Sequence, residues 1–338
     1  MSSGSNTLES IATPPRMLLI VAAFAAIYIV WGSTYLAIRF AIESIPPFLM
    51  AGMRFLVAGS IMFGYLRLRN APMPTRSNWR SAAIVGCLML LGGNGLVCWA
   101  EQHVASGLAA LLIATVPLWM VTLDFLLYRG PRPTASIALG LILGLVGIFI
   151  LIGPADIGGE PIHTMGGIVL LLACVFWSIG SLHARRVNLP RSTTMSASLQ
   201  MICAGVVFFV VGTLAGEWRT FDIAAVSAKS WFSLAYLIVF GAILALTAYN
   251  FLLQNCSPKN VSTYAYVNPV IAVVLGALLA NETLSPRTSV AALIIIASVI
   301  LITYSRKPKP NRDTTVYTQT DTVVVDCSGP TAIESDQR

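Results

Sequence analysis

The chain has 338 residues, of which 56% are hydrophobic and only 10% are charged, and its formal net charge is +7. A soluble globular domain carries about a quarter charged residues, so this composition excludes a water-soluble fold and is typical of a protein whose apolar surface faces lipid. The basic residues gather in short segments between apolar runs, where they indicate membrane topology and not a nucleic-acid surface.

Ten apolar segments, each long enough to cross a bilayer as a helix, follow one another along the chain. The expected helices cover residues 17–38, 47–66, 80–99, 104–127, 134–152, 164–184, 194–214, 231–252, 260–280 and 287–304. The first is too long for the apolar part of a cleavable signal peptide, so we interpret it as a membrane helix. Residues 1–16 are predicted to form a polar cytoplasmic lead, and residues 305–338 a polar tail that is expected to be disordered.

Lysine and arginine are distributed unequally between the two sides of this arrangement. The side that holds both termini carries fifteen of them through Arg312, whereas the opposite side carries only Arg39, Arg219, Lys229 and Arg287. Because positively charged loops stay in the cytoplasm, we expect both termini to be cytoplasmic.

An internal repeat relates the two halves of the chain, with an offset of 146 residues that grows to 152. The matching pairs include Trp31 with Trp177, Arg39 with Arg185, Trp79 with Trp231, Gln102 with Gln254 and Pro117 with Pro269. The halves, 17–152 and 164–304, would each hold five helices, and this odd number inverts the second half in the membrane. The predicted fold is therefore an all-α polytopic membrane protein, with ten transmembrane helices in two inverted five-helix repeats.

The sequence carries no signature of catalysis or of a cofactor. It has no GxSxG, HExxH, P-loop or dinucleotide-binding pattern, its histidines form no ligand cluster, and its six cysteines show no CxxC spacing. We therefore expect neither an enzyme nor a metal site, and the expected partners are a small-molecule substrate and membrane lipid.

Helix-breaking residues lie inside some of the apolar segments. Pro117 and Pro269 occupy matching helices of the two halves, and each removes one backbone donor. Gly93 belongs to a Gly-Gly-Asn-Gly run in the third helix, which the corresponding residues 244–247 do not copy. Because paired interruptions indicate a binding site at the bilayer midplane, Gly93, Pro117 and Pro269 are candidate gating residues.

Polar and aromatic residues within the apolar segments are the candidate substrate-binding residues. They are Trp31, Arg54, Asn94, Trp177, Tyr249, Asn250, Tyr264 and Asn268. Arg54 lies roughly 12 Å from the outer end of its helix, with no acidic residue expected at comparable depth. It could attract an anionic substrate group, or it could extend outward or bind backbone carbonyls. Each neutral residue could instead form a hydrogen bond between helices.

A GxxxG motif, Gly140–Gly144, permits close packing of the fifth helix. We favour packing inside the bundle over packing between protomers, and whether the protein is a monomer or a homodimer is left open.

Several motifs together resemble a known family. They are Trp31-Gly32-Ser33-Thr34 followed by Arg39, Trp99-Ala100-Glu101-Gln102 with Ser106-Gly107-Leu108, Asn268-Pro269 and Asn281-Glu282-Thr283-Leu284. The chain resembles the drug/metabolite transporter superfamily, specifically its ten-helix members with two EamA-type domains. This resemblance implies export or exchange of small metabolites, such as amino acids, across a bacterial inner membrane by alternating access.

The alternative within the same resemblance is a multidrug exporter of organic cations. Such an exporter would need a carboxylate inside the membrane, and the first helix has none. Members of the family also tend to carry a glutamate after the fourth helix of each half. Glu282 fits this pattern, whereas Gly130 takes the equivalent position in the first half.

Overall fold

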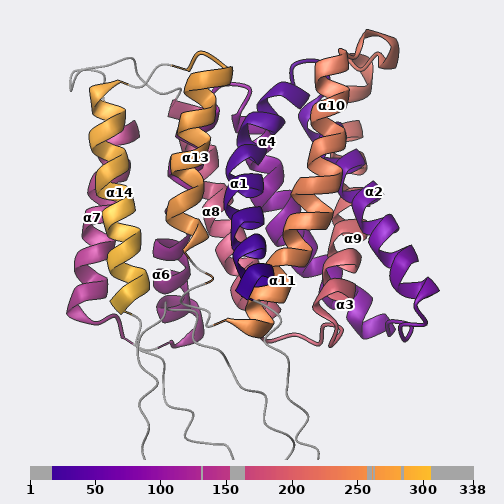
Figure 1. Cartoon of the computed structure of the whole chain (residues 1–338), viewed down its shortest axis with the longest axis horizontal. Helices are drawn as coiled ribbons and strands as arrows, with labels where there is room; N and C mark the ends of the chain where they lie inside the picture. The colour runs from indigo at the N-terminus through magenta and orange to yellow at the C-terminus, as the bar shows by residue number, and fades with distance from the viewer. Residues whose placement is uncertain are drawn as a thin grey trace, which may run out of the picture.

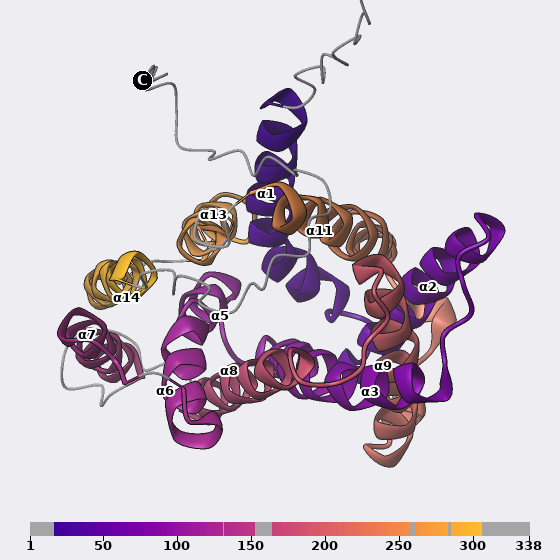
Figure 2. The same ribbon diagram turned by 90° about the horizontal axis from the view of Figure 1, so that it is seen from below.

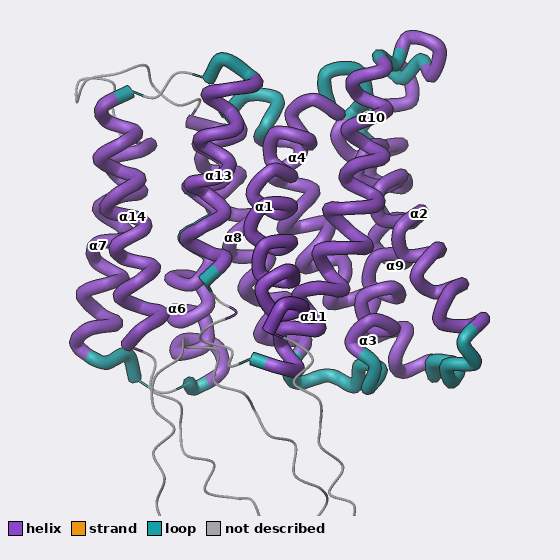
Figure 3. Tube along the Cα trace, viewed as in Figure 1, coloured by secondary structure: helices purple, strands orange, loops and turns teal. Residues whose placement is uncertain are grey.

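The computed structural model describes residues 17–130, 132–152, 164–256, 261, 263–282 and 285–305. This part of the chain is helical and contains no strand (Figures 1 and 3). Nine of its helical spans are long and apolar enough to cross a membrane, and a shorter apolar helix, Tyr264–Leu279, lies in the same bundle. The predicted all-α membrane fold is confirmed, and the expected lead and tail lie outside the described residues.

The first half runs from α1 to α7. Its elements are α1 (Met17–Ala41), α2 (Pro47–Leu68), α3 (Arg76–Gly86), η1 (Cys87–Gly95), α4 (Leu96–Ala100), α5 (Ser106–Ile113), α6 (Val116–Tyr128) and α7 (Ala135–Ile152). The second half has α8 (Thr164–Ala184), α9 (Thr193–Leu214), η3 (Glu217–Arg219), η4 (Ile223–Ala225), α10 (Ala228–Tyr236), η5 (Leu237–Leu244), α11 (Ala245–Asn255), α13 (Tyr264–Leu279) and α14 (Pro286–Ser305).

The start of α1 and the end of α14 lie at the same, lower end of the bundle in Figure 1. We call this the inner end and the opposite one the outer end. Capping residues move some helix starts away from their expected positions. The third span begins at Arg76 and not at residue 80, because Thr75 and Asn78 form a capping box. Ser227 likewise accepts from the Ser230 N–H and starts α10 early.

A π-helical segment interrupts the corresponding span in each half, and this corrects the sequence-based expectation. The glycine-rich run belongs to η1, and η5 repeats the same irregularity in the second half. A π-turn inserts one extra residue into the helical pattern and often marks a functional site. The segment η5 contains one glycine, Gly241, so a run of glycines in the sequence does not predict this second π-helical segment.

The two prolines lie in matching spans but act differently. Pro117 was expected in the middle of a continuous helix, yet α5 ends at Ile113 and Pro117 lies in the first turn of α6. A proline is favourable there, because the first N–H groups of a helix have no partner within it. Pro269 remains inside α13. The helix therefore breaks before the proline in the first half, whereas in the second half it continues through the proline.

Glycines allow helices of the two halves to approach each other closely. Gly205 of α9 faces the backbone of α2, where an added Cβ would lie 2.7 Å from Leu56 N. Gly59 of α2 faces α9 in the same way, 2.9 Å from Ile202 N. Gly140 packs against α14 and accepts a hydrogen bond from Ser298 Oγ at 2.7 Å. The GxxxG glycines thus serve packing inside the bundle, as expected.

Four residues with positive φ reveal the repeat in the backbone. They are Asn70 (57°), Arg129 (53°), Gly216 (75°) and Asn281 (53°), and each follows the end of a long helix. Asn70 and Gly216 are 146 residues apart, and Arg129 and Asn281 are 152 apart, which are the two offsets of the sequence repeat. Since non-glycine residues rarely adopt this conformation, the coincidence supports two inverted halves.

Candidate functional site

An aromatic cluster joins α1 of the first half to α11 and α13 of the second. The ring of Trp31 lies 5.2 Å from that of Tyr249 and 5.3 Å from that of Tyr264, between ring centroids. Tyr249 and Tyr264 are themselves in edge contact at 5.9 Å. Three of the predicted site residues are therefore brought together, although they are far apart in the sequence.

Trp31 also contacts the π-helical segment η5, since its Nε1 donates to the Gly241 carbonyl at 3.3 Å. Its repeat counterpart, Trp177 on α8, lies against the other π-helical segment. An added Cβ on Gly93 of η1 would be 2.9 Å from Trp177 Cε3. Each tryptophan thus packs on the π-helix of the opposite half, which explains why Gly93 is required where it stands.

Asn268 connects α13 to α1 next to the aromatic cluster. It is 7% exposed, and in the amide orientation that satisfies its neighbours its nitrogen donates to the Tyr28 and Tyr264 carbonyls, at 3.2 and 3.3 Å. Asn94 lies in η1 and accepts a hydrogen bond from the Cys98 thiol at 3.6 Å. The side chain of Asn250 lies outside the described part of the structure.

Arg54 is buried in α2, only 4% exposed, so it does not extend outward to solvent. Its Nε and Nη1 atoms have no hydrogen-bond partner, and its Cζ lies 4.9 Å from the centroid of the Phe55 ring. An added Cβ on Gly241 would lie 3.2 Å from Arg54 Nη2. The same turn of η5 therefore meets both Arg54 and Trp31, and the cation lies next to the aromatic cluster.

Glu101 is a buried acid that is not among the substrate-binding residues predicted from the sequence. It follows the last residue of α4, is fully buried, and neither carboxylate oxygen has a hydrogen-bond partner. Burial raises the pKa of Glu101 well above its ordinary value, and Glu282 acts in the same direction, whereas Arg39 and Arg54 lower it. Glu101 therefore interacts electrostatically with Arg54 from the end of α4, and the absence of an acid at the depth of Arg54 stays a prediction.

One signal in the sequence could have identified Glu101. Asn94, Cys98 and Glu101 are spaced at i, i+4 and i+7, which places them on one face of a helix. The two buried members, Cys98 and Glu101, would then face the interior of the bundle with Asn94. Polar residues at this spacing in an apolar segment predict a helix face that points into the bundle. They do not indicate a helix end that is exposed to solvent.

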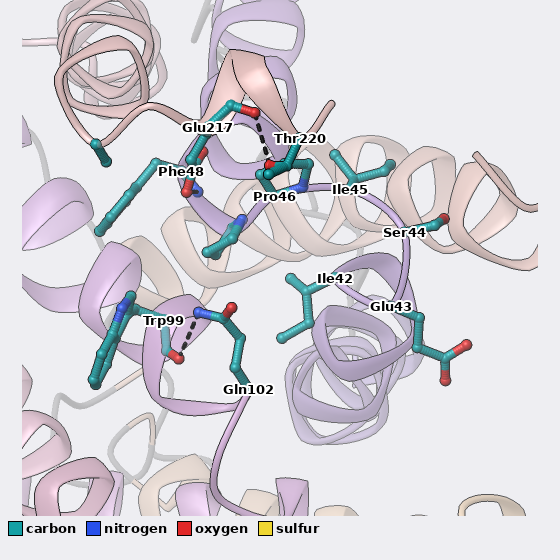
Figure 4. A pocket seen from close by; sticks show the side chains of 12 residues that line it. Ile42, Glu43, Ser44, Ile45, Pro46, Phe48, Trp99, Gln102, Glu217 and Thr220 are labelled. Atoms are coloured by element: carbon teal, nitrogen blue, oxygen red, sulfur yellow. Dashed lines mark hydrogen bonds between the residues drawn. The ribbon is translucent and has the colours of Figure 1, made fainter. Parts of the chain in front are cut away.

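A cavity of about 420 Å³ lies at the outer end of the bundle and does not include the predicted site residues. Its lining comes from the α1–α2 connection and from the ends of α4 and α9, with Phe48, Trp99, Gln102 and Glu217 around it (Figure 4). Arg54 and Glu101 do not line this cavity and are buried by closely packed side chains. A solute could reach these two groups only after the helices around them separate.

The interior arrangement is suited to binding and not to bond chemistry. It combines a buried guanidinium with free donors, three aromatic rings and a buried carboxyl, all between inverted halves. Among the described residues no group of three or more His, Cys, Asp or Glu could hold a metal ion. Inverted repeats with interrupted helices around a polar site are an architecture that many membrane transporters share.

The chain belongs to the EamA-like transporter family, whose profile matches residues 17–153 and 164–304. An uncharacterized inner membrane transporter of Escherichia coli K12, YedA, is 40% identical over 292 residues, covering 86% of this chain and 92% of that protein. These matches and the membrane-spanning helices indicate a small-molecule transporter of the inner membrane and not an enzyme.

Two more distant relatives extend the comparison. A protein of Salmonella typhimurium named as a probable amino-acid metabolite efflux pump is 23% identical over 281 residues, covering 81% of this chain and 91% of that one. One crystal structure has a TM-score of 0.58 at 18% identity and covers 85% of this chain and 98% of its own. The structural likeness concerns the fold alone.

Proposed function

We propose that this transporter exports small metabolites that carry a carboxylate, amino acids among them, by alternating access. The observation that carries the proposal is Arg54, a buried cation with two unpartnered nitrogens beside the aromatic cluster. A guanidinium binds a carboxylate through two parallel hydrogen bonds, and a desolvated one has the most to gain from such a partner. The Salmonella relative, named as a probable amino-acid metabolite efflux pump, supports this substrate class.

Links between the two halves support a conformation closed at the outer end. There, Ser44 Oγ donates to Ser230 Oγ at 2.8 Å, and Lys229 pairs with Glu43 at 2.6 Å. The Glu217 and Glu282 carboxylates of the second half also accept from backbone N–H groups of the first. Toward the inner end, Asn78 donates to the Asn188 carbonyl, Arg186 pairs with Asp124 and lies over the Tyr128 ring, and Ser298 donates to the Gly140 carbonyl. Among these described contacts, carboxylates cap helices of the opposite half at the outer end, and an exporter would load substrate from the other side.

The second candidate is export of organic cations, which the buried Glu101 favours. A carboxyl without partners could receive a cationic group once it ionises. Arg54 opposes this, because a bare cation would approach a buried positive charge. A zwitterion satisfies both groups and is therefore expected to be preferred to either a simple cation or a simple anion.

Counterflow in proteoliposomes tests the proposal directly. Vesicles containing the purified protein would be loaded with one unlabelled solute at a time, drawn from neutral amino acids, monocarboxylates, sugars and cationic dyes, and exchange with labelled solute would be measured. We expect exchange of amino acids and little exchange of dyes. Exchange of dyes without amino acids would replace the proposal by the multidrug alternative.

A further inference from the structure

Two glutamates of the second half cap helices of the first half in the same way. Glu282 Oε1 accepts from Ser106 N and Oγ, both at 2.8 Å, and its Oε2 accepts from Gly107 N at 3.0 Å, at the start of α5. Glu217 accepts from Phe48 N at 3.1 Å and from Leu49 N at 2.8 Å, at the start of α2. A carboxylate at a helix N-terminus pairs free N–H groups and complements the helix dipole.

The backbone places both glutamates by one local arrangement. Gly216 and Asn281, which have positive φ, each stand directly before the glutamate and turn the chain back toward the helix it has left. A glycine about one and a half turns upstream makes room for each carboxylate. An added Cβ on Gly276 would collide with Glu282 Oε2, and one on Gly212 would be 3.1 Å from Glu217 Oε2.

The inverted repeat places the equivalent positions at the inner end, where the acids are missing. The left-handed residues are kept, as Asn70 and Arg129, but Ala71 and Gly130 follow them in place of the two glutamates. The backbone bond is also kept: Gly130 N donates to Asp124 O at 2.9 Å, and Glu282 N donates to Gly276 O at 3.1 Å. Among the described residues, carboxylates of the second half therefore cap helices of the first half at the outer end, whereas at the inner end the Asp124 carboxylate pairs with the Arg186 side chain.

The two glutamate caps join helix pairs that pack differently along their length. The pair α2–α9, held by Glu217, is in close backbone contact deeper in the bundle, through Gly59 and Gly205. The pair α5–α13, held by Glu282, meets at its outer part, where an added Cβ on Gly107 would be 3.1 Å from Val273. Below it the chain breaks before Pro117, and α6 packs on α7, α8 and α14 (Figure 2). Only this second pair diverges toward the inner end.

We propose that Glu282 is the latch of the outer gate, whereas Glu217 is a fixed cap within a pair of helices that moves as one. Opening toward the outside requires the outer ends of α5 and α13 to part, and the hydrogen bonds to Glu282 break in that step. Beside the equivalent inner position, Gly130, stands the Asp124 carboxylate, whose described partner is the exposed side chain of Arg186 and not the start of a helix. The resting protein is therefore closed outside and ready to open inside. This inference rests on the proposed alternating access.

Thiol labelling tests the latch in the full-length protein. A cysteine is introduced at the α5–α13 contact by Val273→Cys, and a membrane-impermeant maleimide is applied from the outside of whole cells without added substrate. Modification of the introduced thiol is followed by peptide mass spectrometry, so the native cysteines can stay. In the otherwise unchanged protein we expect slow labelling, because the contact is closed.

Glu282→Gln leaves one acceptor oxygen and presents an amide N–H to another donor. We expect labelling about tenfold faster, since hydrogen bonds to a charged group shift an equilibrium by at least that factor. Glu282→Asp, which keeps the charge on a shorter side chain, should fall between the two. Glu217→Gln is the matched control, because it loses the same kind of cap, and its labelling should stay at the parent rate.

Two results would overturn the latch. One is a well-inserted Glu282→Gln protein, monodisperse on size exclusion, that is labelled no faster than its parent. The other is equal acceleration by Glu217→Gln, which would indicate general loosening. Failure of the proposed function is separable from both: accelerated labelling in a protein that exchanges no carboxylate solute would refute the metabolite exporter and leave the latch in place.

Discussion

At the scale of single residues, Arg54 combines a positive charge with a buried position in a membrane helix. A buried guanidinium normally has every donor paired, yet two nitrogens of Arg54 have no partner. We predict that Arg54→Gln weakens transport of carboxylate solutes tenfold or more relative to neutral ones, because a close charge pair is worth about 4 kcal/mol at an effective dielectric of 20 before desolvation. Counterflow of a monocarboxylate and of its neutral amide measures the difference.

The same variant separates a binding role from a structural one. If Arg54 supports the fold, its replacement should reduce insertion and thermal stability, with equal loss for every solute. If Arg54 serves the substrate, stability should be unchanged or higher, since an unpaired buried charge is costly. Arg54→Lys, which keeps the charge but loses the planar fork, should retain part of the carboxylate preference.

Glu101 gives a prediction about pH. Burial raises its pKa in the folded protein, so the folded state holds this proton at pH values where the unfolded chain, with a carboxyl pKa near 4.3, has lost it. The free energy of unfolding therefore falls as pH rises above about 4. We predict that Glu101→Gln increases it at pH 7, by about 1–3 kcal/mol, and flattens this dependence. Thermal unfolding of the parent and of Glu101→Gln would be compared at pH 4.5 and 7. The stability gained by the substitution should largely disappear at the lower pH, where the Glu101 carboxyl becomes protonated in the unfolded state as well.

The sequence singles out several residues that the structure brings together, because polar and aromatic residues are rare in apolar segments. Trp31, Tyr249 and Tyr264 do meet, and Arg54 contacts the same residue of η5, Gly241, as Trp31 does. Glu101 was missed because an acid at a helix end is usually solvated, and only its tertiary surroundings show that it is covered. The contribution of each of these residues to transport stays a prediction.

At the scale of helices, the crossing of α2 and α9 depends on the absence of side chains. An added Cβ on Gly205 would lie 2.7 Å from Leu56 N, a backbone atom that cannot turn aside. We predict that Gly205→Ala lowers the free energy of unfolding by about 1–3 kcal/mol. Gly64 is the matched control on α2, with no neighbouring atom within 4 Å of the added Cβ.

Gly64→Ala should leave stability unchanged or raise it by about 0.5–1 kcal/mol, through the better helix propensity of alanine. Thermal unfolding in one detergent compares the two alanine variants. Similar losses for both would show that the close approach does not limit stability.

The helices also show where patterns in the sequence stop being informative. Apolar length predicts that a span exists, since the bilayer thickness fixes it. It does not predict how the span is interrupted, because π-helical turns depend on what packs beside them. The segment η1 has three glycines, while η5 has only Gly241, yet both adopt the same geometry against a tryptophan of the other half.

At the scale of the whole molecule, the remaining prediction concerns orientation. The start of α1 and the end of α14 lie at one end of the bundle, and the basic residues favour that end as cytoplasmic (Figure 1). An enzyme reporter active only in the periplasm, fused after Lys307, should therefore give no signal. The same reporter inserted near Lys229 should be active, and the opposite pattern of signals would invert the topology.

The packing of the repeats has a consequence for how the chain is made. The helices of the first half pack chiefly on helices of the second: α1 on α11 and α13, α2 on α9, and α7 on α14. During synthesis, the first five spans enter the membrane before most of these partners exist. Gly140 meets Ser298 across 158 residues of chain. The helices that are inserted first are therefore exposed to lipid, with their glycine-lined faces uncovered, until the last span is inserted.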